Sequence, residues 1–302
     1  MAFFDAITID IYRDDLLSPW EFKGKPDGNS GVSFGLTQAL GLEFPEMEIF
    51  TQPKGLGDGV FFTGQRMQPR TIEIHAKQLG RTPEELFHHR RQIMEYFLMD
   101  HEFKIVIEVE DQGTWSTKTR CLNDCKLIAA SYPTIDAADT NPEIVLQFLA
   151  PDPYFEAPTE STRTVANLGE SVEWTTVGVT GDVKVRPIIK MTCTTTKPNV
   201  DYVAITMPEL GLYSITVFNY ARTGAYVQVG DVILIDPEAG EILVNGTNTG
   251  HPGDINSIFM KLYLYPNSNN NFAYWTSDTS QTTNPGTKWT VEFEWTERFA
   301  GI

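Results

Sequence analysis

Histidine and carboxylate side chains are the groups in this 302-residue chain that could bind a metal or catalyse a reaction. His88 and His89 are adjacent, so on a helix they would point about 100° apart and could not share one ion in the usual i, i+4 geometry. Four acids within eleven residues could include the carboxylate pair of a glycoside or peptidoglycan hydrolase: Asp231, Asp236, Glu238 and Glu241. A hairpin turn with solvated edges explains this cluster more simply. We therefore expect no catalytic residue, no metal site and no cofactor.

Aromatic side chains could instead stack on sugar rings. Tyr274 and Trp275 lie in the polar segment 267–286, which we interpret as a loop, and a protein partner or a glycan could contact them there. Another apolar set has period-two spacing and predicts the buried face of a final strand: Trp289, Val291, Phe293 and Trp295. Tyr274 and Trp275 are therefore the aromatic candidates for a binding site.

Composition places the chain among globular proteins, with 41% hydrophobic and 12% aromatic residues and a length that suits two domains. The net charge of −17 would repel nucleic acid and anionic membranes, and no basic run compensates for it. No stretch approaches the ~20 apolar residues of a membrane helix, and the first ten residues lack a secretory signal pattern. With three sparse cysteines, we expect assembly in a reducing cytoplasm, without disulfides or membrane insertion.

The segment 148–155 divides the chain. Residues 142–150 alternate as in a strand with a buried face, and Pro151 and Pro153 then end the ladder because proline has no N–H to donate. A polar stretch follows. The sequence therefore predicts an N-terminal domain over residues 1–153 and a C-terminal domain over residues 154–302.

One helix is predicted in the first half. Thr82 suits the N-cap, Pro83 the first helical position and Glu85 the third, where it completes a capping box. Its apolar residues recur at helical spacing up to about residue 99 and predict a single buried face: Leu86, Phe87, Ile93, Met94, Phe97 and Leu98. Strand patterns flank the helix, so we expect an α+β domain built on mostly antiparallel sheets.

A glycine-rich segment precedes this helix, with the sequence GLGDGVFFTG over residues 55–64. It is not followed by the Lys-Ser/Thr and helix of a phosphate-binding loop, so we interpret it as a mobile loop or arm. The second half contains no good helix pattern. Its strand-like runs recur at short intervals between turn residues, which predicts an all-β sandwich.

Taken in order, four features resemble the distal tail proteins of long-tailed bacteriophages. They are the strand PRTIEI at 69–74, the helix at 82–99 with the hairpin that follows, the junction F-x-A-x-D-P-Y-F at 148–155, and VILIDPEAGEILVNGTN at 232–248. The resemblance covers essentially the whole chain. It implies a structural virion protein, with no enzymatic activity, at the tip of the phage tail.

The same resemblance implies a homo-hexameric ring of N-terminal domains around a channel, with galectin-like C-terminal sandwiches outside. Implied partners are the tail tube protein, the tail-associated hub protein and receptor-binding proteins, and DNA would pass through the channel without specific binding. The net charge leads us to expect a negative channel wall. An arm embracing the neighbouring subunit would map to the glycine-rich segment, at Gly55, Gly57, Gly59, Phe61 and Phe62.

Two other functions remain open from sequence alone. The β-sandwich could bind a host glycan through Tyr274 or Trp275, which would make the chain a carbohydrate-binding adhesion protein. The abundant carboxylates could also belong to a cell-wall hydrolase.

Overall fold

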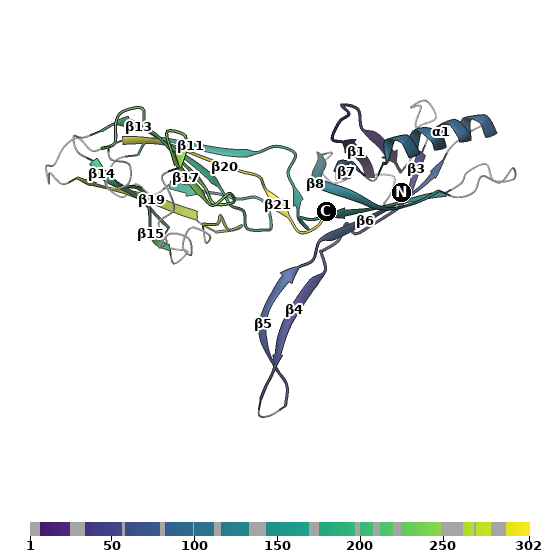
Figure 1. The fold of residues 1–302 in the computed structure, drawn as a ribbon, viewed down its shortest axis with the longest axis horizontal. Coiled ribbons are helices and arrows are strands. Elements are labelled where there is room, and N and C mark those ends of the chain that lie inside the picture. Colours follow the sequence, from purple (N-terminus) through teal and green to yellow (C-terminus); the bar gives the residue numbers. More distant parts are fainter. Residues whose placement is uncertain are drawn as a thin grey trace. The chain divides into compact units, whose positions relative to one another are not determined.

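The structure is a computed structural model that describes residues 7–24, 34–55, 58–78, 82–98, 100–111, 116–132, 143–168, 175–196, 200–207, 212–219, 225–248, 262–268, 270–278 and 288–302. Two compact units make up the chain (Figure 1): Met1–Pro158 with Phe299–Ile302, and Thr159–Arg298. The division therefore falls after residue 158 rather than after residue 153. Phe155 shows why, because its fully buried side chain belongs to the core of the first unit.

A closed barrel forms the body of the first unit. Its strands are β1 (Ile7–Arg13), β2 (Trp20–Lys23), β3 (Phe34–Leu40), β6 (Arg70–Gln78), β7 (Glu102–Asp111), β8 (Ser116–Ser131) and β9 (Glu143–Ala150). They pair in the order β8-β7-β1-β2-β3-β6-β9, and β9 pairs back onto β8. The β2–β3 pair is parallel and the others are antiparallel. Short strands β10 (Phe155–Glu156) and β21 (Arg298–Phe299) extend the sheet beyond β8.

Alternating apolar residues fill the barrel, because successive side chains of a strand point to opposite faces. Ile9 and Ile11 of β1 are fully buried and lie opposite Ile107 and Ile105 of β7. The inward residues of β6 and β9 repeat this pairing across the barrel. The predicted antiparallel sheet is thus confirmed, whereas its closure into a barrel was not predicted.

Helix α1 (Pro83–Tyr96) begins as predicted, with the Thr82 hydroxyl accepting a hydrogen bond from the Glu85 N–H at 3.2 Å. Phe97 caps the other end and packs in an aromatic cluster with Trp20, Phe22, Phe103 and Phe148. Within the described residues, no helix has the length and hydrophobicity needed to cross a membrane.

The predicted buried face of α1 is wrong at three positions. Leu86, Ile93 and Phe97 are buried as expected, at i, i+7 and i+11. Three others form a second stripe of the same spacing, one residue further along, and are 44–60% exposed: Phe87, Met94 and Leu98. One residue corresponds to about 100° of rotation, so this second apolar stripe turns away from the core.

Strands β4 (Met47–Pro53) and β5 (Val60–Met67) form a separate two-stranded sheet inserted between β3 and β6. The glycine-rich segment 55–64, interpreted from the sequence as a mobile loop or arm, therefore contains the first five residues of strand β5. At its base, Gly41 has a φ of +81°, and a Cβ there would overlap the carbonyl of Thr71. Only glycine fits this close approach.

Arg70, the first residue of β6, is 3% exposed and closes the base of this hairpin. Four backbone carbonyls accept its hydrogen bonds: those of Gly41 (2.6 Å), Glu43 (2.5 Å), Pro153 (2.6 Å) and Ala300 (2.7 Å). Its guanidinium carbon also lies 4.3 Å from the centre of the Phe155 ring. Burial lowers the pKa of Arg70 to about 10, which still leaves it charged at neutral pH. One side chain thus joins the foot of the hairpin, the exit from β9 and the C-terminal residues.

The second unit contains two antiparallel sheets around one core. One sheet has the order β11 (Ser161–Leu168), β20 (Lys288–Trp295), β13 (Ile188–Thr195), β16 (Val232–Asp236), β17 (Glu241–Val244) and β18 (Thr247–Asn248). The other has the order β12 (Thr175–Val177), β19 (Asn270–Asp278), β14 (Val200–Met207) and β15 (Leu212–Asn219). Phe272 of β19 meets Phe293 of β20, with ring centroids 4.6 Å apart.

The predicted buried face of the last strand is confirmed, because Trp289, Val291, Phe293 and Trp295 are at most 7% exposed. Just beyond it, the carboxylate of Glu297 is also buried. It accepts hydrogen bonds from the N–H groups of Thr180 (3.1 Å) and Gly181 (2.8 Å) and from the Trp295 indole (2.9 Å). These donors compensate for removing the charge from water.

Replacing Arg70 by Lys tests the buried guanidinium. An ammonium group keeps the charge but cannot reach four carbonyls in different directions, so buried acceptors lose their donors. We expect the free energy of unfolding of the first unit, measured in urea, to fall by about 3 kcal/mol. The control Arg66→Lys changes an exposed ion pair with Glu48 and should cost less than about 0.5 kcal/mol. Equal effects of the two substitutions would contradict this assignment.

Candidate functional site

The β4–β5 hairpin extends from the barrel as an isolated ribbon (Figure 1). Its strands pair from Met47 opposite Met67 to Pro53 opposite Val60, and the N–H of Lys54 donates to the carbonyl of Gly59 at the tip. Gly59 has a φ of +97°, which favours glycine in this turn. A two-stranded ribbon in water is marginally stable by itself. Burial within the hairpin therefore cannot explain why its strands carry apolar residues.

Both strands of the hairpin carry exposed apolar side chains. These are Met47 (40% exposed), Ile49 (59%), Phe50 (40%), Val60 (55%), Phe61 (55%) and Phe62 (62%). Two cations partly cover the rings, because Lys54 lies 5.5 Å from the Phe61 centroid and Arg66 lies 5.5 Å from that of Phe50. Several large apolar side chains exposed on one ribbon are typical of protein–protein contact sites. We identify the hairpin as the main candidate interaction surface.

The structure places four of the five predicted arm residues on this hairpin: Gly55, Gly59, Phe61 and Phe62. Gly57 lies outside the described residues. The glycines are at the turn, whereas the two phenylalanines are in β5. Sequence reasoning missed β4 and its apolar residues Ile49 and Phe50, although the alternating run before the glycines could have indicated a hairpin partner.

The outer stripe of α1 is a second exposed apolar surface. An open groove of about 450 Å³ is lined by Phe87, Arg90, Arg91, Met94, Glu95 and Leu98. Arg91 and Glu95 form an ion pair of 2.7 Å along one wall. The first unit therefore presents apolar surface on both the hairpin and the helix.

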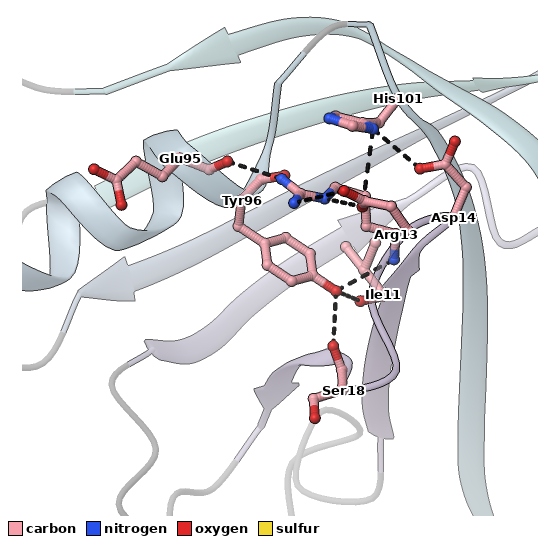
Figure 2. Close-up of polar contacts among 8 residues, drawn as sticks. Ile11, Arg13, Asp14, Ser18, Glu95, Tyr96 and His101 are labelled. Atoms are coloured by element: carbon pink, nitrogen blue, oxygen red, sulfur yellow. Dashed lines mark hydrogen bonds and ion pairs between the residues drawn. The ribbon is translucent and has the colours of Figure 1, made fainter.

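Tyr96 and Arg13 attach α1 to strand β1 (Figure 2). The single proton of the Tyr96 hydroxyl is shared between the carbonyls of Ile11 (2.7 Å) and Ser18 (3.1 Å). Arg13 donates to the carbonyls of Glu95 (2.9 Å) and Tyr96 (3.1 Å), which have no partner within the helix. The direction of the outer apolar stripe is thus fixed by polar contacts at the end of the helix.

Asp14, Asp15 and His101 lie beside these contacts, with one ligand atom from each within 4.8 Å of the others. Asp15 makes two hydrogen bonds with Arg13, at 2.5 and 3.1 Å, and this contact lowers the pKa of Asp15. His101 Nδ1 lies 3.0 Å from Asp14 Oδ1, and a dashed line marks this contact in Figure 2. All three residues thus have hydrogen-bond partners within the protein.

The acids singled out from sequence have turn roles. Asp236 Oδ1 accepts hydrogen bonds from the N–H groups of Glu238 and Ala239, both at 2.9 Å. Asp231 accepts from the Gln228 N–H at 2.7 Å and from the Asn245 amide at 2.9 Å. These contacts confirm the turn interpretation for Asp231 and Asp236.

Tyr274 and Trp275 do not lie in a loop, contrary to the sequence prediction. Both belong to strand β19, opposite Ile205 and Ala204 of β14. Polar residues surround them and favoured a loop in the sequence pattern. Pairing with the distant strand β14 decides that this segment is a strand.

A carboxylate stripe crosses the outer face of the barrel. Asp10 of β1 lies opposite Glu21 of β2, and Glu108 of β7 is nearby. Partial burial, followed by repulsion from Glu21 and Glu108, raises the pKa of Asp10 to about 6, and Lys23 opposes this shift only weakly. Among the described residues, Asp10 Oδ1 has no hydrogen-bond donor.

Replacing Tyr96 by Phe removes the hydroxyl, so the carbonyls of Ile11 and Ser18 lose the one proton that they share. We expect the free energy of unfolding in urea to fall by about 1 to 2 kcal/mol. A change below about 0.5 kcal/mol would show that this hydroxyl does not hold the helix.

Asp10→Asn tests the carboxylate stripe through pH. The folded state binds the Asp10 proton more tightly than the unfolded state, so stability falls as pH rises from about 4 through the folded pKa near 6. The shift corresponds to about 3 kcal/mol, which solvent screening of this half-buried group reduces to about 1. At pH 7 the variant should be more stable by that amount, and at pH 3.5 it should match the wild type. A variant that is less stable at pH 7 would contradict the stated cause.

No family model and no curated protein matches this chain. Among solved structures, the Dit (gp 19.1) protein of phage SPP1, a hub adsorption protein of phages that infect Gram-positive bacteria, matches with a TM-score of 0.59 and 16% identity. That match covers 96% of this chain and 99% of the SPP1 chain. A chain of the phage p2 baseplate matches with a TM-score of 0.45 and 7% identity, over 98% of this chain and 99% of its own length. The match to SPP1 Dit shows that this chain, across both units, has the fold of that protein. This is the fold that the sequence resemblance to distal tail proteins implies.

Proposed function

We propose that this chain is a distal tail protein of a long-tailed bacteriophage, a structural subunit of the virion that catalyses no reaction. The observation that carries the proposal is the match to SPP1 Dit over 96% of this chain, which includes both units. The subunit would be assembled in the host cytoplasm and reside at the tail tip.

In this proposal the first unit forms a ring of six copies, with the tail tube protein on one side and the tail-associated hub protein on the other. The hairpin, with its exposed Phe61 and Phe62, would be the arm that contacts the neighbouring copy. A lone ribbon gains stability when a partner covers its apolar side chains, which favours this role.

The second unit would be a galectin-like β-sandwich on the outside of the ring, available to receptor-binding proteins. Its two antiparallel sheets around one core support this description. A glycan contact through Tyr274 or Trp275 stays a prediction, and both residues belong to the paired strand β19.

Light scattering on the purified protein tests the proposal. For the protein alone we expect a mass of six times 34.0 kDa, about 204 kDa, or, where the tail tube protein is needed to close the ring, a larger complex that contains six copies of this chain. The double substitution Phe61→Ser and Phe62→Ser should shift the mass toward 34.0 kDa without unfolding the subunit, since both side chains are exposed.

Val229→Ser is the matched control, because Val229 is 63% exposed on the second unit and should leave the mass unchanged. A wild type that stays at 34.0 kDa under both conditions would contradict the ring. A hexamer that survives the double substitution would remove the hairpin from the interface.

A further inference from the structure

An isolated β-bridge joins two segments of the second unit that are distant in sequence, and it brings four polar and aromatic side chains together. Val185 and Leu264 form this antiparallel bridge, with N–H to carbonyl distances of 3.0 and 2.8 Å, and both side chains are buried. Their sequence neighbours therefore point to the opposite, outer face. Those neighbours are Lys184, Arg186, Tyr263 and Tyr265, and we call them the basic–aromatic cluster.

Tyr263 organises the cluster. Lys184 Nζ lies 4.0 Å from the centre of its ring, and Arg186 Cζ lies 5.1 Å from it. Arg186 Nη2 also donates a hydrogen bond of 2.9 Å to the Tyr263 hydroxyl, and Tyr265 packs edge-on at 6.3 Å. Attraction of both cations to one ring offsets their mutual repulsion. Two positive charges are thus held side by side.

Neither cation is neutralised by a carboxylate in the part of the chain that the structure describes. Lys190 of the same unit, in contrast, lies 3.7 Å from Glu292. An uncompensated pair of cations is unexpected on a chain with a net charge of −17, where carboxylates are abundant. The pair is therefore suited to a ligand that brings its own negative charge.

The hydrogen-bond donors of the cluster define that ligand. Lys184 has three N–H donors, and Arg186 keeps donors beyond the one it gives to Tyr263. Because the Tyr263 oxygen accepts from Arg186, its own proton can be donated outward. The cluster therefore offers several donors and two charges to a group with several acceptor oxygens.

We propose that the basic–aromatic cluster binds a phosphate group, either free or as a phosphate ester. Phosphate presents more acceptor oxygens than a carboxylate and matches the planar fork of arginine. This site does not depend on ring formation and would give the second unit a ligand-binding role in addition to the proposed scaffold.

The test is ³¹P line broadening of inorganic phosphate and of glycerol 3-phosphate by the full-length protein at low salt. Lys184→Gln combined with Arg186→Gln should weaken binding at least about tenfold, because charge-assisted hydrogen bonds are lost. Lys184→Gln alone should weaken it less and cannot disturb the fold, because Lys184 is exposed. Lys190→Gln, the control, should bind like the wild type.

Acetate at equal concentration should fail to displace the phosphate, and Tyr263→Phe should weaken binding while leaving the melting temperature unchanged. A stronger effect of glycerol 3-phosphate than of inorganic phosphate would identify an ester as the ligand, and the reverse would identify free phosphate. Phosphate binding that survives the double substitution, or that acetate competes for equally, would overturn the proposal.

Discussion

The buried guanidinium of Arg70 is the interaction on which the first unit depends. It lies where the hairpin leaves the barrel, and its four carbonyl partners come from segments far apart in sequence. A charge in this position is tolerated because four of the five N–H donors of the guanidinium have carbonyl acceptors. The hairpin therefore starts from a fixed base, where Gly41 packs against the carbonyl of Thr71. A long ribbon can project from the barrel only if its base is held in this way.

The exposed apolar residues then have a consistent explanation. Apolar side chains that stabilise a subunit by themselves are buried, as they are in the cores of both units. Instead, the ribbon exposes Ile49 and Phe62, and α1 exposes Phe87, while polar contacts through Tyr96 hold the helix at the rotation that keeps Phe87 outside. Surfaces of this kind become stable when another molecule covers them. A subunit designed for assembly explains this better than an isolated monomer.

Local chemistry determined which features could be predicted from the sequence. The N-cap at Thr82 and the period-two face ending at Trp295 involve neighbours in the chain, and both are confirmed. Closure of the barrel by β8 and β9, the return of Ala300 to Arg70, and the pairing of Val185 with Leu264 are contacts between distant residues. No local pattern encodes them. The sequence predicted one buried face for α1, but the helix carries two apolar stripes. Only tertiary packing decides which of the two stripes is buried.

Electron microscopy of the purified protein, alone and mixed with a tail tube protein, tests directly whether the chain is a ring-forming distal tail subunit. If the chain is a distal tail subunit, averaged particles should show a six-fold ring with an open centre and peripheral density from the second units. Particles without rotational symmetry under both conditions, or a closed assembly with no central opening, would contradict it.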